Sequence, residues 1–420
     1  MRARAFWGLV FAGVVGSFYL TSSACDVYTP ALLEADTTER PPAKNGIGWW
    51  SKTDEKGCFT AGVPTEADRP PPQGDKDIGP IVMAIQSMRL GSLNEQLQID
   101  PNAWQDIGFD IDQSCTASET CDLGDDLPPQ SCRAGASQLP RDGRNCRDNT
   151  FGRLEHAAAL VPELAKKYGL SDDAFNCALC VGHYNFLIKL TGYNGEPEDD
   201  RLRVDLYPSP GLEKPLPWDC RQPDWRQKPC FTPDMPWTVL EDSLTEKRPG
   251  PDLPPSTMFD DNAYAHEGYL VMHLPNDALF WFPGYNGLVV AFPLRIQQGV
   301  VAGKIVRGPD GVFRIEDGMI AGRVKANDMV GAFRLIGLCE TTDSNYDLMK
   351  TFIDSNLDVI TDGRKDENVP CDGMSLGIAF TAQQARAGKL ETVAPLVECV
   401  QPETKLNPRD AGAEASPDGG

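Results

Sequence analysis

The sequence predicts a β-rich fold of the α+β class: a β-sandwich or jelly-roll-like body with a few peripheral helices, held together by disulfides. Three observations predict it. Short apolar segments separated by turn residues recur along the 420-residue chain. The 39 glycines and 35 prolines favour many turns over long helices. The 13 cysteines indicate an oxidising compartment, where disulfides can stabilise loops that bury little apolar surface.

The first 24 residues have the pattern of an export signal. Arg2 and Arg4 precede an apolar run at residues 6–20, which is short for a membrane span. Small residues then lead to Cys25, as at a bacterial lipoprotein cleavage site, although Ser22 stands where that site usually has leucine. We therefore predict lipidation of Cys25. Ordinary signal-peptidase cleavage after residue 24 is the alternative, and an uncleaved anchor is a third interpretation.

Cysteine parity supports lipidation, because 13 is odd and one cysteine needs a role other than pairing. With Cys25 lipidated, twelve cysteines remain, which is enough for six disulfides. The predicted disulfide cysteines are Cys58, Cys115, Cys121, Cys132, Cys146, Cys177, Cys180, Cys220, Cys230, Cys339, Cys371 and Cys399.

The formal net charge of −22 disfavours nucleic acid as a partner, because like charges repel. Residues 25–77 form a lipid tether and proline-rich lead-in. Within it, Trp49 and Trp50 are expected to dock on the body, with Cys58 holding the segment in place. The alternative is an exposed apolar patch at the two tryptophans.

Residues 78–207 are interpreted as a cysteine-rich β framework with one helix. Strands are expected at 78–90 and 104–112, followed by a loop from Cys115 to Cys146 that depends on disulfides. Asn149 and Thr150 are suited to cap a helix over 151–168, in which Pro162 predicts a kink. Strands at 184–192 and 202–207 should pair, because apolar and polar residues alternate in the second one.

Residues 208–257 are a loop insertion rich in proline and tryptophan, part of which Cys220 and Cys230 are expected to close. Residues 258–400 should form a β-rich body with two helices, and residues 401–420 a disordered tail. In this body the predicted strands are 268–274, 278–282, 287–296, 300–307, 312–316, 319–324 and 375–381, and the predicted helices are 327–336 and 346–360.

Three segments carry a resemblance to a known group of proteins. They are the run from Gly108 to Cys115 (GFDIDQSC), the later Cys146–Asn149 (CRDN) and the acidic loop at residues 192–200 (GYNGEPEDD) ahead of a strand. Together they resemble uncharacterised, cysteine-rich exported lipoproteins of Gram-negative soil bacteria. The resemblance implies export and lipidation. It implies no activity, because the function of that group is not established.

Oxygen-bearing side chains near predicted strand ends suggest a Ca²⁺ site, because Ca²⁺ takes six to eight such ligands, often from loops. No EF-hand is present, since the Asp-x-Asp-x-Ser run lacks the glycine and distal glutamate. The alternative is that these residues only cap turns. The candidate ligands are Asp110, Asp112, Asp148, Asn149, Asn194, Glu196, Asp199 and Asp200.

Aromatic residues in and beside the insertion suggest a second kind of site. Trp218, Trp225 and Trp237, with Tyr207, could form a flat platform for a sugar ring. The alternative, that these rings cover the core, is favoured on general grounds.

Other motifs predict no catalytic site. The Gly-x-Ser-x-Gly run at 373–377 lacks a histidine after it, so the chain order of a serine hydrolase fails. The Cys177-x-x-Cys180 pair is better explained by disulfides than by redox catalysis. The four histidines show no metal-binding spacing.

The leading functional interpretation is a non-enzymatic envelope or surface lipoprotein that binds a ligand, such as a polysaccharide, with support from Ca²⁺. Its expected location is the outer membrane, periplasm or cell surface, with the membrane as a partner through the N-terminal lipid. Two alternatives stay open. One is a structural envelope protein with a protein partner, and the other is a hydrolase that uses scattered carboxylates.

Overall fold

The computed structural model describes residues 48–53, 58–74, 76–116, 130–135, 139–159, 172–218, 220, 222, 224–246, 253–282, 292–335, 338–340, 344–393 and 399. The predicted signal peptide, Cys25, Cys121, the second half of the 151–168 helix and the C-terminal tail lie outside these residues. All described residues belong to one unit, residues 43–420, and the insertion at 208–257 does not divide it.

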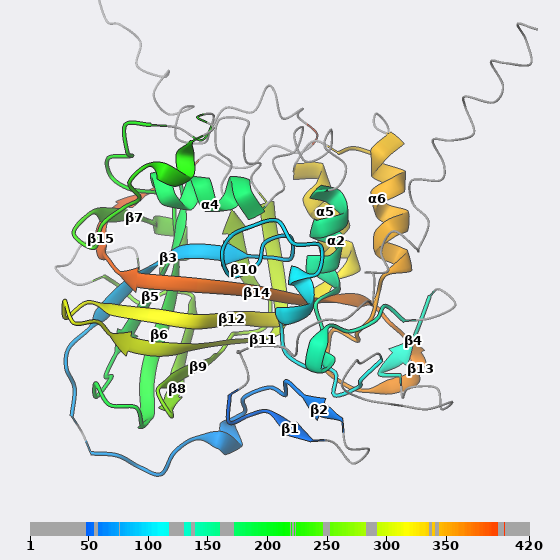
Figure 1. Cartoon of the computed structure of the whole chain (residues 1–420), viewed down its shortest axis with the longest axis horizontal. Helices are drawn as coiled ribbons and strands as arrows, with labels where there is room; N and C mark the ends of the chain where they lie inside the picture. Colours follow the sequence, from blue (N-terminus) through cyan, green and yellow to red (C-terminus); the bar gives the residue numbers. More distant parts are fainter. Residues whose placement is uncertain are drawn as a thin grey trace, which may run out of the picture. The chain divides into compact units, whose positions relative to one another are not determined.

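Eight antiparallel strands close into a barrel (Figure 1). Each strand pairs with the next barrel strand along the chain, and the last pairs with the first. In order, the strands are β3 (Ile81–Arg89), β5 (Asn185–Thr191), β6 (Asp199–Ser209), β8 (Met258–His266), β9 (Tyr269–His273), β11 (Phe292–Arg307), β12 (Phe313–Lys325) and β14 (Gly373–Gln384).

The prediction of a sandwich or jelly roll was therefore wrong. A sandwich keeps separate sheets with free edges, whereas here β9 pairs with β11 and β14 pairs with β3, so the sheet closes on itself. Short alternating strands are common to both architectures. The difference lies in the pairing between the first and last strands, which local sequence patterns do not encode.

Alternation along the strands separates an apolar interior from two covered outer faces. On β5, for example, Ile188 belongs to the interior cluster and its neighbour Leu187 to an outer one. The interior cluster draws residues from all eight barrel strands and from the helices. One outer face packs against the insertion, and the other packs against the lead-in and the segment 107–111. The barrel wall is thus buried on both sides over much of its area.

Most predicted strands are confirmed, with changed ends. The expected hairpin of β5 and β6 has Ile188 opposite Leu206. The prediction at 287–296, of which residues 287–291 lie outside the described residues, and that at 300–307 fall on one long strand, β11. Those at 312–316 and 319–324 fall on β12. Register shifts in the β11–β12 ladder mark the places where the sequence suggested breaks. Strand β8 was not predicted.

Short strands and 3₁₀ helices lie outside the barrel. The strands are β1 (Lys52–Thr53), β2 (Phe59–Thr60), β4 (Cys132–Arg133), β7 (Pro236–Leu240), β10 (Ala278–Phe282), β13 (Asp366–Pro370) and β15 (Arg386–Glu391). The 3₁₀ helices are η3 (Glu66–Asp68), η4 (Ala103–Asp106), η5 (Arg144–Cys146), η6 (Trp225–Gln227) and η7 (Glu241–Ser243).

The strand predicted at 104–112 was wrong, because this segment is η4 followed by irregular chain. Its apolar side chains do alternate, and Ile107, Phe109 and Ile111 are buried against the outer face of the barrel. However, its backbone bonds to side chains and loops instead of a sheet. Gly108 N–H, for instance, points at the sulfur of Met319, 3.1 Å away.

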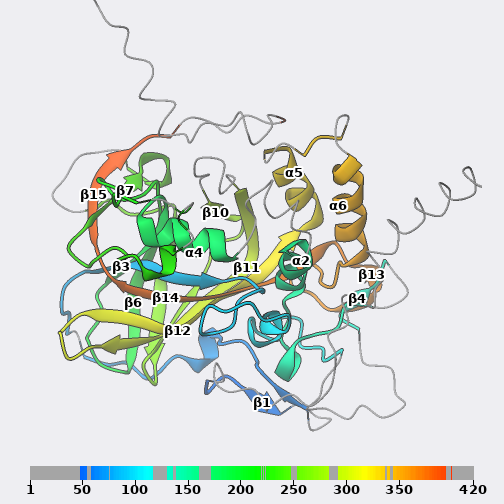
Figure 2. The same ribbon diagram turned by 45° about the horizontal axis from the view of Figure 1, so that its top comes forward.

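Four helices are described: α2 (Thr150–Ala159), α4 (Asp172–Val181), α5 (Ala326–Leu335) and α6 (Ser344–Ser355). Figure 2 shows α5 and α6 side by side, and α2 contacts β14. The first, third and fourth were predicted, whereas α4 was not. Within the described ranges, no helix has the length and apolarity needed to cross a membrane.

Five disulfides join described cysteines, and Cys58 is also disulfide-bonded. The pairs are Cys115–Cys146, Cys132–Cys371, Cys177–Cys220, Cys180–Cys230 and Cys339–Cys399. Disulfide use of the Cys177-x-x-Cys180 pair is confirmed, since each sulfur has a different partner. Cys220 and Cys230 do not close the insertion on itself. Each one ties it to α4 instead.

The lead-in docks on the barrel as expected. The Trp50 ring packs edge-on against Phe109 and Tyr269, with centroids 5.9 and 5.0 Å away. The indole N–H of Trp49 donates to the backbone oxygen of His266 at 3.1 Å. Because both tryptophans make these contacts, they do not form a free apolar patch.

Candidate metal centre

Three carboxylates that the sequence indicated as Ca²⁺ ligands come together in the structure. Asp110, Asp112 and Asp148 each offer one oxygen, and these oxygens all lie within 4.8 Å of one another. Asp110 and Asp148 are 2% exposed, whereas Asp112 is half-buried. The group therefore combines two enclosed carboxylates with one that faces solvent in part.

A disulfide joins the two chain segments that supply these residues. Cys115 comes three residues after Asp112, and Cys146 comes two residues before Asp148. The Cys115–Cys146 bond brings their Cα atoms within 4.9 Å, although the cysteines are 31 residues apart in sequence. The backbone adds a direct contact, since Asp148 N–H donates to the carbonyl of Phe109 at 2.9 Å.

Backbone amides hold the carboxylates in place. One oxygen of Asp148, Oδ2, accepts from the N–H groups of Ile111 and Asp112 at 2.7 and 3.1 Å. In the same way, Asp112 Oδ1 accepts from Ser114 N–H at 2.8 Å. These bonds fix one face of each carboxylate and leave other oxygen lone pairs for a ligand.

Glycine is required where the two segments meet. Gly108 has φ of +112°, and a Cβ atom there would lie 2.6 Å from the carbonyl oxygen of Asp148. The guanidinium of the fully buried Arg147 donates from Nε to the Gly108 carbonyl at 3.1 Å. The close approach of the two chain segments thus depends on the absence of a side chain at position 108.

Two buried oxygens of the Asp-x-Asp-x-Ser run have no partner among the described residues. They are Asp110 Oδ1 and Ser114 Oγ, from side chains that are 2% and 1% exposed. The Asp110 carboxylate also accepts bonds from the Thr60 hydroxyl and from Gln113 N–H, so it is held firmly. A buried carboxylate oxygen without a donor costs free energy unless a cation or proton satisfies it.

The electrostatic environment of the three aspartates also favours a bound cation or proton. Burial raises the pKa of Asp110 and that of Asp112 to about 6, and the charge of Asp110 contributes to the shift at Asp112. Burial also raises the pKa of Asp148 well above its usual range, with further contributions from Asp112 and Asp142. The carboxylates therefore repel one another in an environment that disfavours their charge.

Nearby cations offset only part of this charge. Arg323 on β12 is 7% exposed and donates to the carbonyl of Ile111 at 2.5 Å, so it contacts backbone and not a carboxylate. The Nζ of Lys365 donates to the carbonyl of Gln113 at 3.0 Å. Both residues attract the aspartates at longer range.

The donor set fits a hard divalent cation. Ca²⁺ binds oxygen at about 2.3–2.6 Å, so two of its ligands can be up to about 5 Å apart. The 4.8 Å limit for Asp110, Asp112 and Asp148 meets this condition. Zn²⁺ prefers histidine and thiolate ligands at shorter distances, and the group contains neither.

Asn149, a predicted ligand, has a structural role instead. Its side-chain oxygen accepts from Gly152 N–H at 3.0 Å and from Gly377 N–H at 2.9 Å. Its amide donates to the carbonyls of Leu90 and Trp104 at 3.2 and 3.3 Å. Through the bond to Gly152 it caps α2, as the sequence predicted.

The structure does not bring the acidic loop at 192–200 into the aspartate group. Asp199 Oδ2 accepts from Asn194 N–H at 2.7 Å, and Asn194 Oδ1 accepts from Glu196 N–H at 2.8 Å. Glu196 also pairs with Lys76 at 2.7 Å, and Asp200 accepts from Gln73 N–H at 2.6 Å. These side chains stabilise the β5–β6 turn and the lead-in, as the turn-capping alternative expects.

The predicted aromatic platform is largely buried. Trp218 and Trp225 are each 9% exposed and pack against the disulfides of α4, whereas Trp237 and Tyr207 are 0% exposed in a separate cluster. The four rings therefore do not present one shared flat surface. They pack instead with other apolar residues of the insertion, such as Phe231 and Val239, over the barrel wall and α4.

A second group with metal-binding atoms lies between the lead-in and the barrel. It consists of Glu66, Asp260 and His273. Glu66 pairs with Arg69 through its side chain and lies 3.2 Å from Nδ1 of His273. Asp260 accepts from the backbone N–H of His273 at 2.8 Å. We interpret this group as a surface ion-pair network, which sequence spacing did not reveal.

The Gly-x-Ser-x-Gly run lies within β14 and is not a nucleophile elbow. The hydroxyl of Ser375 donates to Asp358 at 2.5 Å, and its oxygen accepts from Thr150 N–H at 2.9 Å. A Cβ atom on Gly377 would lie 2.9 Å from the backbone of Gly108. The small residues of this run are therefore explained by the close packing of β14 against the segment that carries Asp110 and Asp112.

The buried Asp358 should make stability depend on pH. Burial raises its pKa to about 6, although hydrogen bonds from Ser375 and Thr150 oppose the shift. The folded-state pKa lies above that of the unfolded chain, so protonated Asp358 contributes to the free energy of unfolding. This contribution is complete below about pH 4 and is lost as the pH rises through about 6. With chelator present, Asp358→Asn should reduce the fall in unfolding free energy between pH 4 and 7 by about 2–3 kcal/mol.

Urea unfolding at a series of pH values would measure this difference. Asn keeps the shape of the side chain and the acceptor for Ser375 N–H, which lies 2.8 Å from Asp358 Oδ1. An unchanged fall in the variant would mean that the pKa of Asp358 is not raised in the folded protein.

Comparison of the chain with protein-family models, with curated proteins and with solved structures found no match.

Proposed function

We propose that this protein is an exported, non-enzymatic binding protein whose disulfide-bonded barrel carries a Ca²⁺ site at Asp110, Asp112 and Asp148. The observation that carries the proposal is the buried Asp110 Oδ1, which has no partner among the described residues although two other carboxylates lie beside it. A bound Ca²⁺ would satisfy this oxygen and neutralise the repulsion within the group.

The burial of the site supports a stabilising role for the ion. Lectin-like sites need open coordination positions where a sugar hydroxyl can bind, whereas Asp110 and Asp148 are 2% exposed. Only the half-buried Asp112 faces solvent in part. We therefore propose that Ca²⁺ orders the loops on this side of the barrel and that a polysaccharide or protein ligand would bind elsewhere.

Export and lipidation remain part of the proposal. The disulfides support export, because such bonds persist in oxidising compartments. Lipidation of Cys25 rests on the sequence alone, and it would hold the barrel at a membrane through the lead-in. Mass spectrometry of the N-terminal peptide from the membrane fraction would test it, since a diacylated cysteine has a distinctive mass.

Calcium titration tests the central claim. The chelator-treated protein, with its disulfides intact, should bind one Ca²⁺ in this site by isothermal titration calorimetry. At a concentration one hundred times the dissociation constant, Ca²⁺ should raise the unfolding free energy by about 2.7 kcal/mol. Mg²⁺ should bind less well, because it loses its hydration water reluctantly and demands a near-ideal octahedral shell at shorter distances than Ca²⁺. No heat and no stabilisation would refute the proposal.

A structural envelope protein is the second candidate function. The aromatic platform that favoured a glycan is buried, so a polysaccharide has less support than the sequence suggested. Retention on a panel of cell-wall polysaccharides, with Ca²⁺ and then with chelator, separates the two. Retention would favour a glycan-binding module, and its absence would favour the structural role.

A further inference from the structure

The calcium site is built across one disulfide. Two of its ligands, Asp110 and Asp112, lie before Cys115, and the third, Asp148, lies after Cys146. The cysteines are 31 positions apart, and few of the residues between them are apolar, so hydrophobic burial alone does not bring the two ends together. Three residues beside the site also have positive φ: Gln113 (57°), Asn145 (57°) and Cys146 (59°).

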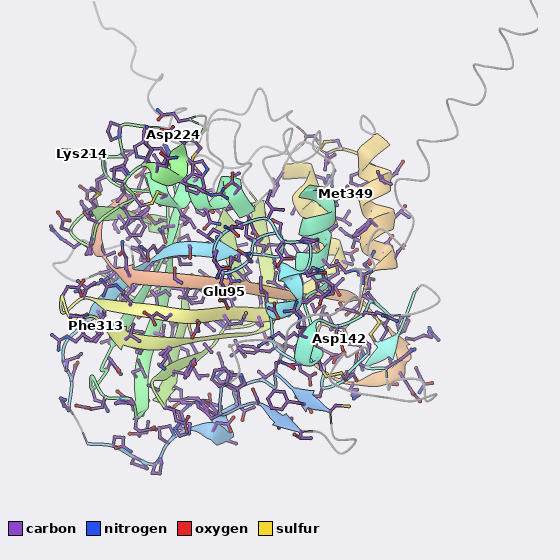
Figure 3. All side chains as sticks on the ribbon, viewed as in Figure 1. Glu95, Asp142, Lys214, Asp224, Phe313 and Met349 are labelled. Atoms are coloured by element: carbon purple, nitrogen blue, oxygen red, sulfur yellow. A yellow bond between two sulfur atoms is a disulfide. The ribbon has the colours of Figure 1, made fainter. Side chains whose placement is uncertain are left out.

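Two other disulfides lie in different parts of the molecule. Cys177–Cys220 and Cys180–Cys230 tie the insertion to α4 and contribute no ligand. Figure 3 labels Asp142, which shares the Cys115–Cys146 loop, beside β4 and β13, and it labels Lys214 and Asp224 of the insertion in a separate region. The chain thus offers a disulfide at the site and a matched disulfide remote from it.

We propose that oxidation of Cys115 and Cys146 creates the calcium site, so that the reduced chain binds Ca²⁺ weakly and the exported, oxidised chain binds it well. This inference rests on the proposed function. It makes calcium binding conditional on export, because cytoplasmic thiols stay reduced.

The chemical step is an ordinary thiol–disulfide exchange with a small-molecule or protein disulfide as oxidant. The two cysteine thiols lose two protons and two electrons to form one S–S bond, and the oxidant disulfide is reduced to two thiols. Because Cys115 and Cys146 are 5% and 0% exposed, the bond is enclosed once formed. The two equilibria are coupled. If oxidation raises the calcium affinity by a given factor, bound Ca²⁺ must shift the thiol–disulfide equilibrium towards the disulfide by the same factor.

The first test compares calcium affinities by calorimetry. Cys115→Ser/Cys146→Ser should bind Ca²⁺ at least about tenfold more weakly than the unaltered chain. Cys177→Ser/Cys220→Ser, the matched control, should keep the affinity within about twofold. Far-UV circular dichroism would establish that both variants retain the barrel.

The second test uses the unaltered chain and does not depend on a variant that folds. The protein is treated with dithiothreitol in Ca²⁺ or in chelator, and alkylation followed by peptide mass spectrometry reports each disulfide. Because the enclosed bond can be reduced only when the site opens and releases its ion, Ca²⁺ should slow reduction of Cys115–Cys146 at least about tenfold and that of Cys177–Cys220 much less.

The outcomes separate the two proposals. If the unaltered chain binds no Ca²⁺, the proposed function and this inference both fail. If it binds Ca²⁺ but the Cys115→Ser/Cys146→Ser variant binds it equally well, only the inference fails. Equal slowing of both disulfides in the second test would also overturn the inference, because it would show global stabilisation without a specific link.

Discussion

Asp110→Asn is expected to abolish stabilisation by Ca²⁺ while leaving the calcium-free protein at least as stable as the unaltered one. The asparagine keeps one oxygen to accept from Thr60 and Gln113, as the carboxylate does. Its amide would replace the unpartnered Oδ1 and face two carboxylates, so an electrostatic repulsion would become a hydrogen bond. The variant would lack a charged ligand and thus lose the stabilisation of about 2.7 kcal/mol expected at saturating Ca²⁺.

Urea unfolding with Ca²⁺ and with chelator would measure both effects. The control is Asp200→Asn at the start of β6, which removes an acidic residue that is not part of the aspartate group. The control should respond to Ca²⁺ as the unaltered protein does. If Asp110→Asn retained the calcium response, or if it destabilised the protein equally in both conditions, the aspartates would be turn caps and not ligands.

Asn149→Ala is expected to be among the most destabilising single substitutions in the described part of the chain. The side chain is 1% exposed and makes four hydrogen bonds to backbone groups of η4, α2, β14 and the chain after β3. Alanine would remove the bond to the Leu90 carbonyl and those to the N–H groups of Gly152 and Gly377, whereas the Trp104 carbonyl would still accept from Ile107 N–H. At about 1–3 kcal/mol for each group that loses its bond, the loss should reach about 4 kcal/mol or more.

Asn194→Ala provides the matched comparison. Asn194 is also buried, but its side chain ties together only one turn, through bonds to Glu196 and Glu198. Its removal should cost about 1–2 kcal/mol. Equal losses for the two variants, measured by urea unfolding, would show that Asn149 does not connect the site to the barrel as described.

The sequence predicted much of the fold through local patterns. Strands such as β5 and β6 were found because apolar residues alternate and turn residues separate them. Helix α4 was missed because its buried face includes Asn176, which bonds to the backbone of Met88, as well as two cysteines. The barrel itself was missed because closure depends on the contact between β3 and β14, at opposite ends of the body.

For the candidate site, residue type was informative but position was not. Asp110, Asp112 and Asp148 were named from their chemistry, and the structure brings these three together. Asn149 and the residues of the acidic loop have the same kinds of oxygen ligand as these three aspartates. In the structure, however, their side-chain oxygens accept hydrogen bonds from backbone N–H groups. A disulfide between Cys115 and Cys146 would have separated the acidic loop from this group, because it brings Asp110 and Asp112 near Asp148. It would not have separated Asn149, which directly follows Asp148.

The closing pair of strands has a consequence for how the chain folds. Ser87 on β3 and Thr381 on β14 share a hydrogen bond of 2.7 Å across 294 residues of sequence. Because the chain is synthesised from its N-terminus, one edge of β3 stays without its β14 partner until nearly all of the chain has been made. Such an edge is a template for aggregation, and contacts this distant form slowly. We therefore expect the nascent chain to need protection from aggregation until β14 has been made. Truncation before residue 373 should leave β3 and β12 as two unpaired edge strands, whereas in the complete protein both pair with β14.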